Sequence, residues 1–216
     1  MTMGNLITNI QAQKRNRNRV NIYLDDEYAF SLDRMAAAWL TVGKQICKED
    51  IFRLQEKDEF ETALNRALHF LSYRARSEKE MQTYLGNKGY EEPQIERVVA
   101  RLKEENLIND LDFAQNWLDS RQRHHPRSQS VMKYELRQKG VAESEIEEAL
   151  RASGLDDLEL ALKVGRKLSP RYQNLDKMEF DRKLAGALQR RGFTYAIVKD
   201  CLSILWKEKS ESLGVD

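Results

Sequence analysis

Positively charged side chains are the residues of this sequence best suited to chemistry, and the chemistry they suit is the binding of anions. They gather in two segments, because residues 121–139 carry a net charge of +5 and residues 163–192 carry +6. Residues 141–160 between them carry −6, and the whole chain has a formal net charge of only +1. Helix dipoles account for one or two charges at each helix end, which is fewer than these segments contain.

We define ten cations, eight from these two segments and two from residues 74–76, as the basic ridge and predict that they form a binding surface. They are Arg74, Arg76, Arg121, Arg123, Arg127, Lys133, Arg137, Lys139, Arg190 and Arg191. Two interpretations stay open at this point: a solvated face with no partner, and a surface that meets phosphate or an acidic protein. Contacts to phosphate would give affinity without sequence information and a steep dependence on salt.

Other kinds of chemistry have little support in the sequence. His124 and His125 have no partner at metal-ligand spacing, because His69 is the only other histidine. Cys47 and Cys201 are far apart, so we expect two buried or idle thiols in a reducing cytosol. The phosphate-loop, dinucleotide and nucleophile motifs are missing, and no pair of acids is singled out for proton transfer. We therefore expect no catalytic residue, no metal, no cofactor and no enzymatic activity.

The elements that must position the basic ridge come from an internal repeat of roughly fifty residues. Gly89, Gly140 and Gly192 stand 51 and 52 residues apart, and each has a leucine four residues before it and an apolar residue directly after it. Further apolar residues match eight residues before and six residues after each glycine. We expect each glycine to adopt the left-handed conformation that ends a helix, with the following apolar residue packed back against it.

The spacing of apolar residues predicts three helices in each repeat, with Ser77, Asn109 or Asp110, and Ser128 as caps. In the first repeat we expect one helix at about 58–75, a second from the cap Ser77 to Gly89, and a third with Pro93 in its first turn before the apolar residues of 95–102. In the second repeat, the first helix follows the cap at 109 or 110 and carries the apolar residues of 113–118, the second follows Ser128, and the third runs from about 142 to 152. In the third repeat, the first helix carries the apolar residues of 158–168, the second precedes Gly192, and the last runs from 195 to 206. Most tryptophans and tyrosines fall at the spacing of core residues, so we expect Trp39, Trp117 and Trp206 to be buried instead of stacking on bases.

The first fifty residues follow a different pattern, with apolar and polar residues alternating as they do in strands. We expect a small antiparallel sheet from strands at 6–13, 20–24 and 27–32, followed by a short helix at 34–40. The polar segment 14–19 is either a loop or a further phosphate contact. The expected domains are residues 1–51, three repeats at 52–108, 109–154 and 155–209, and a tail at 210–216. The absence of a long apolar run predicts a soluble, cytoplasmic protein.

The sequence resembles the RecX family, whose members regulate the bacterial RecA recombinase. The resemblance is carried by ALNRALHFLSYRARSEKEMQTYLGNKGY (63–90), LKEENLINDLDFAQNWLDSR (102–121) and YELRQKGV (134–141). It covers about 52–206 together with VNIYLDDEYAFSL (20–32), and the third repeat keeps mainly LAGALQRRGF (184–193). The loop HHPRSQS (124–130) departs from the glycine-containing loop expected before the second helix of a repeat.

The resemblance implies a mainly α-helical fold, in which tandem three-helix repeats form an elongated, curved array. It implies a protein without a cofactor that binds RecA and the RecA filament on single-stranded DNA. Such a protein suppresses filament growth and the recombinase, ATPase and coprotease activities in recombination, DNA repair and the SOS response. We expect a monomer that uses the basic ridge against the filament and has weak direct affinity for DNA. Two alternatives stay open: a stand-alone helix-turn-helix-like DNA-binding module, and a helical scaffold for another acidic partner.

Overall fold

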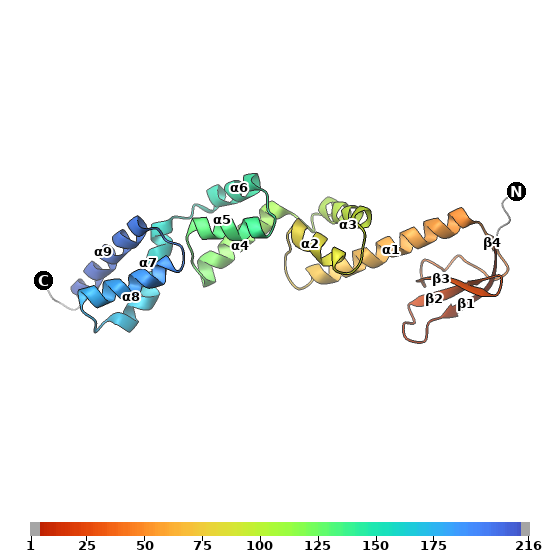
Figure 1. Ribbon diagram of the computed structural model, residues 1–216, viewed down its shortest axis with the longest axis horizontal. Helices are drawn as coiled ribbons and strands as arrows, with labels where there is room; N and C mark the ends of the chain where they lie inside the picture. The colour runs from red at the N-terminus through yellow and green to blue at the C-terminus, as the bar shows by residue number, and fades with distance from the viewer. Residues whose placement is uncertain (1–4, 213–216) are drawn as a thin grey trace. The chain divides into compact units, whose positions relative to one another are not determined.

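The computed structural model (Figure 1) describes residues 5–212. The chain divides into two compact units. The first unit consists of residues 1–74 and 84–101, and the second of residues 75–83 and 102–216. The described part of the chain is mainly helical, with a small antiparallel sheet near its N-terminus, as the sequence predicts. The strands are β1 (Asn5–Ala12), β2 (Arg19–Leu24), β3 (Glu27–Asp33) and β4 (Gln45–Ile46). The helices are α1 (Lys48–Leu71), α2 (Glu78–Gly86), α3 (Glu92–Glu104), α4 (Asp110–His124), α5 (Gln129–Gln138), α6 (Glu143–Ser153), α7 (Asp157–Leu168), the 3-10 helix η1 (Ser169–Tyr172), α8 (Lys177–Gln189) and α9 (Tyr195–Ser212).

The sheet of the first unit has the strand order β3-β2-β1-β4, and all its pairs are antiparallel. β2 and β3 are joined by a two-residue turn, in which Asp25 and Asp26 both have positive φ, as a tight hairpin requires. Val20, Ile22 and Leu24 point to the buried face, so the alternation predicted for this strand is confirmed. The three predicted strands are present, and the two-residue strand β4 was not predicted.

The buried carboxylate of Asp58 fixes α1 onto the sheet of this unit. Its two oxygens accept hydrogen bonds from the Arg19 guanidinium at 2.8 Å and from the backbone N–H of Asp33 at 2.6 Å. Residues 14–18 of the polar segment 14–19 connect β1 and β2, and Arg19 is the first residue of β2. The part of this segment that pairs with Asp58 therefore has a structural role, because a buried charge needs a partner.

Two expectations for the first unit are wrong. Residues 34–39 form consecutive turns instead of a short helix. Ala37 within them and Leu40 directly after them are buried in the core of the sheet, whereas Trp39 is half exposed. α1 begins at Lys48, ten residues before the predicted start at 58. Residues 55–59 contain no apolar residue, so the helical period is interrupted there, and Leu54 and Ile51 before this stretch pack against the core of the sheet.

The second unit is built around one continuous core that α4 to α9 share. Phe113, Leu136, Ile146, Phe180 and Val198 belong to this core and come from five different helices. α7, α8 and α9 lie side by side (Figure 1). The Trp206 ring packs edge-on against the Phe180 ring. Trp117 also packs against the core, and both tryptophans are partly buried there. The expectation of burial is therefore met in part for these two and is wrong for Trp39, which is exposed.

Each repeated glycine ends a helix as predicted. Gly89, Gly140 and Gly192 have φ of +87°, +81° and +85°. In each case, the residue after the glycine donates a backbone hydrogen bond to the leucine four residues before the glycine, and the donors are Tyr90, Val141 and Phe193. This is the hydrogen bond of a Schellman motif, which satisfies a carbonyl that the end of a helix leaves without a partner.

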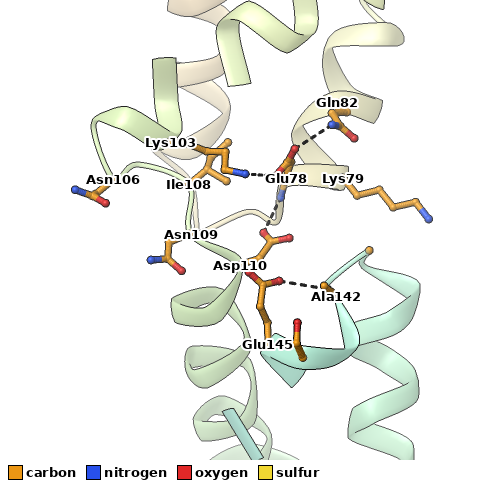
Figure 2. A pocket seen from close by; sticks show the side chains of 12 residues that line it. Glu78, Lys79, Gln82, Lys103, Asn106, Ile108, Asn109, Asp110, Ala142 and Glu145 are labelled. Carbon is orange, nitrogen blue, oxygen red and sulfur yellow. Dashed lines mark hydrogen bonds and ion pairs between the residues drawn. The ribbon is translucent and has the colours of Figure 1, made fainter. Parts of the chain in front are cut away.

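Gly140 also allows a close contact with the start of α2, which we call the first repeat joint. The Ser77 hydroxyl donates to the Lys139 carbonyl at 2.6 Å, and it accepts the N–H of Glu80 at 3.2 Å as the predicted helix cap. The Asp110 carboxylate accepts the N–H of Glu78 at 2.8 Å (Figure 2). A Cβ on Gly140 would collide with the Cβ of Lys79.

A second repeat joint of the same design lies between α5 and the end of α8. The N–H of Ser128, the cap of α5, donates to the Arg191 carbonyl at 3.0 Å. Asp157 accepts the N–H of Gln129 at 2.8 Å, as Asp110 does in the first repeat joint. A Cβ on Gly192 would collide with Val131 and lie 2.7 Å from the Ser128 hydroxyl. The two repeat joints fix the positions of the helices that carry the basic residues of the second unit.

Candidate anion-binding site

A hollow of about 490 Å³ in the second unit collects positive charge from five segments of the chain. We call the seven cations that line it the basic hollow. They are Arg123, Arg127, Lys163, Lys167, Arg171, Arg190 and Arg191. His124 and His125 also line it, and no carboxylate does so among the described residues. A concave surface with donors of one sign of charge and no competing acid is suited to binding an anion.

The folding of the second repeat joint brings these cations together. α4 ends at His124, and the loop that follows carries Arg127 to the cap Ser128. Ser128 is hydrogen-bonded to the carbonyl of Arg191, so this loop is tied to the end of α8. Lys163 and Lys167 come from α7, and Arg171 comes from η1. The loop 124–130, where the sequence departs from the family pattern, therefore forms one wall of the hollow.

Helix dipoles offset only part of this charge. α4, α7 and α8 all end beside the hollow, and each C-terminus carries a partial charge of about −0.5. Arg123 pairs with Asp119 at 3.1 Å and Arg127 with Glu135 at 2.9 Å. Lys163, Lys167, Arg171 and Arg190 form no ion pair with any residue in 5–212. A surplus of about three to four positive charges is left after these offsets.

Glu135 organises the cations next to the hollow. Its carboxylate accepts hydrogen bonds from Trp117 Nε1 at 3.0 Å, from Arg121 Nε at 2.7 Å and from Arg127 Nη1 at 2.9 Å. The Glu135 side chain is 15% exposed, and the Arg121 guanidinium also lies 4.4 Å from the centre of the Trp117 ring. Arg121 is therefore committed to a partner inside the chain, whereas Arg127 reaches from Glu135 to the hollow.

Acids of α6 compensate the basic face of α5. Arg137 forms two hydrogen bonds with Glu143, at 2.7 and 2.8 Å, and Lys133 lies 2.5 Å from Glu143 and 3.2 Å from Glu147. Arg137, followed by Lys133, lowers the pKa of Glu143 to about 2. The acidic segment 141–160 thus folds back on the basic segment 121–139 at this point, and the two charge runs partly cancel.

The other members of the basic ridge lie elsewhere. Lys139 pairs with Glu80 at 2.6 Å in the first repeat joint and lies over the Trp117 ring. Arg74 and Arg76 lie in the connection between α1 and α2, and both interact with other groups of the chain. Of the ten ridge residues, the basic hollow brings together Arg123, Arg127, Arg190 and Arg191.

Sequence reasoning missed Lys163, Lys167 and Arg171 as members of the site. A signal for them was present, because they stand four residues apart in the segment that carries +6. Residues at this spacing lie on the same side of a helix. Only the fold shows that this row of cations faces the end of α4 and of α8.

The polar hollow at the first repeat joint is larger, about 750 Å³, but its charges are mixed (Figure 2). Lys103 pairs with Glu78 at 2.8 Å, and Glu145 accepts the N–H of Ala142 at 3.3 Å. Burial raises the pKa of Asp110. Because Lys103 pairs with Glu78, and the carboxylates of Asp110 and Glu145 accept backbone N–H groups, this hollow is part of the scaffold and is a poor candidate for binding an external ion.

Neither a metal centre nor a membrane segment is found between residues 5 and 212. These residues contain no group of three or more histidines, cysteines and acids that could hold a metal ion. No helix within them is long and apolar enough to cross a membrane. Cys47 is partly exposed, Cys201 is buried, and both are free thiols.

Comparison with known proteins assigns almost every part of the chain. Residues 5–47 match the regulatory protein RecX N-terminal domain, and residues 63–102, 109–150 and 156–202 match the first, second and third three-helix domains of RecX. The regulatory protein RecX of Bacillus pumilus is 36% identical over 95% of this chain and 79% of that protein, and the one of Bacillus subtilis is 35% identical over the same shares. A crystal structure of regulatory protein RecX superposes with a TM-score of 0.65 at 29% identity, over 91% of this chain and 99% of that one. The chain therefore belongs to the RecX family of regulatory proteins.

Proposed function

We propose that this protein regulates RecA by binding RecA and its filament on single-stranded DNA. In this proposal, it lowers the recombinase, ATPase and coprotease activities of the filament in recombination, DNA repair and the SOS response. It acts in the cytoplasm as a monomer and catalyses no reaction itself. Membership of the RecX family supports a regulatory role, because the match extends through all four domains.

The observation that carries the proposal is the basic hollow. A filament on single-stranded DNA presents phosphate groups together with a protein surface, and a surplus of three to four positive charges suits the phosphates. The rest of the basic ridge is also proposed to contact the filament. Its ion pairs with Glu135, Glu143 and Glu80 mean that those cations would have to exchange partners on binding.

The test is the ATPase activity of RecA on single-stranded DNA with increasing amounts of this protein. We expect the rate to fall as the protein is added, and we expect the protein to sediment with the filament. An unchanged rate without co-sedimentation, at protein concentrations above that of RecA, would contradict the proposal. The same chain with reversed charge at Arg123, Arg127, Lys133 and Arg137 is expected to inhibit less. Full inhibition by that folded variant would refute the assignment of these four residues.

A second candidate is a stand-alone DNA-binding module, and the basic hollow favours it too. The third helix of the second repeat argues against helix-turn-helix reading of a groove, because α6 carries four glutamates and one arginine. The second candidate requires saturable and sequence-selective binding to duplex DNA by this protein alone. Binding that is not selective, and that becomes much tighter when RecA is present, would favour regulation of the filament.

A further inference from the structure

The basic hollow differs from the rest of the charged surface because four of its seven cations have no ion pair within residues 5–212. Lys163, Lys167 and Arg171 are exposed side chains, and no ion pair within residues 5–212 involves them. Lys133 and Arg137, in contrast, are held by two acids of α6. An external anion that contacts the unpaired cations of the hollow would therefore gain ion pairs without breaking existing ones, which is the condition for a preorganised site.

The amount of uncompensated charge indicates the charge of the ligand. One phosphodiester or one sulfate would neutralise only part of a surplus of about three to four charges. An anion with three or four clustered charges matches it. Arginine supplies planar pairs of donors that fit phosphate oxygens, and the two lysines act as point charges.

The walls of the hollow add a second criterion. Pro126, Val164 and Leu168 line it together with the cations, so part of the surface is apolar. Its volume of about 490 Å³ lies within the range of sites that hold small organic ligands. Such a surface suits a ligand in which phosphates are attached to a sugar or a base better than it suits a bare inorganic ion.

We propose that the basic hollow is a binding site for three or four clustered phosphate charges of a nucleotide-type ligand. Two sources have this chemistry: consecutive phosphodiesters of single-stranded nucleic acid, and the triphosphate of a nucleotide. The inference rests on the proposed function in that it names the ligand of the same site. It concerns this protein alone, however, and RecA is not needed for its test.

The experiment is a fluorescence anisotropy titration of the full chain with two probes, a labelled oligothymidylate and a labelled nucleoside triphosphate, each at 50 and 200 mM salt. The variant Lys163→Glu/Lys167→Glu/Arg171→Glu reverses the charge of three of the seven cations of the hollow. Lys48→Glu/Arg53→Glu/Lys57→Glu makes the same change in net charge on α1 of the first unit and serves as the matched control. The variant Lys163→Gln/Lys167→Gln/Arg171→Gln repeats the test without introducing acids.

We expect at least one probe to bind the natural chain, and we expect the hollow variant to lose at least about tenfold in affinity, with a smaller loss in the control. For the oligonucleotide, the slope of log affinity against log salt should decrease in magnitude by about two, since each lost contact with a single strand contributes about 0.7. Displacement of one probe by the other would show that both use the hollow. Binding of only one would identify the source of the phosphates.

The proposal is overturned if neither probe binds, or if the control variant loses as much affinity as the hollow variant. These outcomes are separate from those of the RecA assay. Inhibition of RecA without binding of either probe would leave the proposed function standing and remove this inference. Binding that depends on the hollow, without any effect on RecA, would support this inference and contradict the proposed function.

Discussion

Replacing Gly192 by alanine should destabilise the second unit far more than the same change at a glycine outside the repeat joints. Gly192 has φ +85°, and an added Cβ would collide with Val131 and lie 2.7 Å from the Ser128 hydroxyl. Gly154 lies in the same unit and also has a positive φ, of +58°, but a Cβ there would meet nothing within 4 Å. The comparison therefore separates backbone strain from the close approach of two repeats.

The magnitudes follow from these two terms. At Gly154, alanine is strained in the left-handed backbone conformation, but it also lowers the entropy of the unfolded chain. The two effects together should lower the free energy of unfolding by about 1 kcal/mol. At Gly192, overpacking adds about 1–3 kcal/mol, because Val131 and the cap Ser128 are held by their own helix. We expect a total loss of about 2–4 kcal/mol for Gly192→Ala. Gly89→Ala, at the equivalent position in the first repeat, should behave like Gly154→Ala, since a Cβ on Gly89 also meets nothing within 4 Å.

The assay is urea unfolding, followed by the fluorescence of Trp117 and Trp206 in variants without Trp39, so that the signal reports the second unit. The difference in free energy of unfolding between Gly192→Ala and Gly154→Ala is the quantity of interest. Equal losses for the two variants would refute the argument that the glycine is needed for contact between repeats. The same comparison for Gly140→Ala tests the first repeat joint, where the obstacle is Lys79.

Three further predictions concern single side chains. Glu135→Gln leaves Arg121 and Trp117 with a weaker hydrogen-bond acceptor, so the free energy of unfolding measured in urea should fall by about 1–3 kcal/mol. The same change releases Arg127 from its ion pair, so the affinity of the hollow for the phosphate probes should rise. Glu143 has a pKa of about 2 in the folded chain, lowered from 4.5 by Arg137 and Lys133, so its contribution to stability is present above pH 4.5 and is lost as the pH falls towards 2. Acid unfolding of Glu143→Gln should accordingly be less steep than that of the natural chain, and identical acid curves would contradict the ion pairs. Burial raises the pKa of Cys201 to about 11, so about one thiol in a thousand is ionised at pH 8. We expect maleimide to label the partly exposed Cys47 first and Cys201 only in urea, as mass spectrometry would show.

The repeat and its helix ends could be predicted from the sequence because their causes are local. A glycine with a leucine four residues before it and an apolar residue after it is sufficient to specify a Schellman end, and Gly89, Gly140 and Gly192 all form one. The caps Asn109 and Ser128 were recognised for the same reason, since a cap accepts a hydrogen bond from a residue three positions further on. The early start of α1 was missed because its contact with the sheet is not local.

The sequence predicted the kind of ligand that the candidate site would bind, an anion, but not which residues would come together to form the site. Segregated charge indicated cations in excess, among them Lys133 and Arg137. Nothing in the local sequence showed that Glu143 and Glu147 would fold back on these two cations, because the turn after Gly140 decides where α6 lies. Likewise, the hollow exists because Arg191 is tied to Ser128, a contact between residues 63 positions apart. The domain boundaries proposed from the sequence stay a prediction.

Inhibition of RecA by three matched proteins tests the central claim most directly. RecA ATPase on single-stranded DNA should be measured with the natural chain, the hollow variant Lys163→Glu/Lys167→Glu/Arg171→Glu, and the control Lys48→Glu/Arg53→Glu/Lys57→Glu. We predict strong inhibition by the natural chain, retained inhibition by the control, and a shift of the inhibition curve of the hollow variant to at least about tenfold higher concentration. Unimpaired inhibition by a folded hollow variant would contradict the claim that this surface carries the regulation.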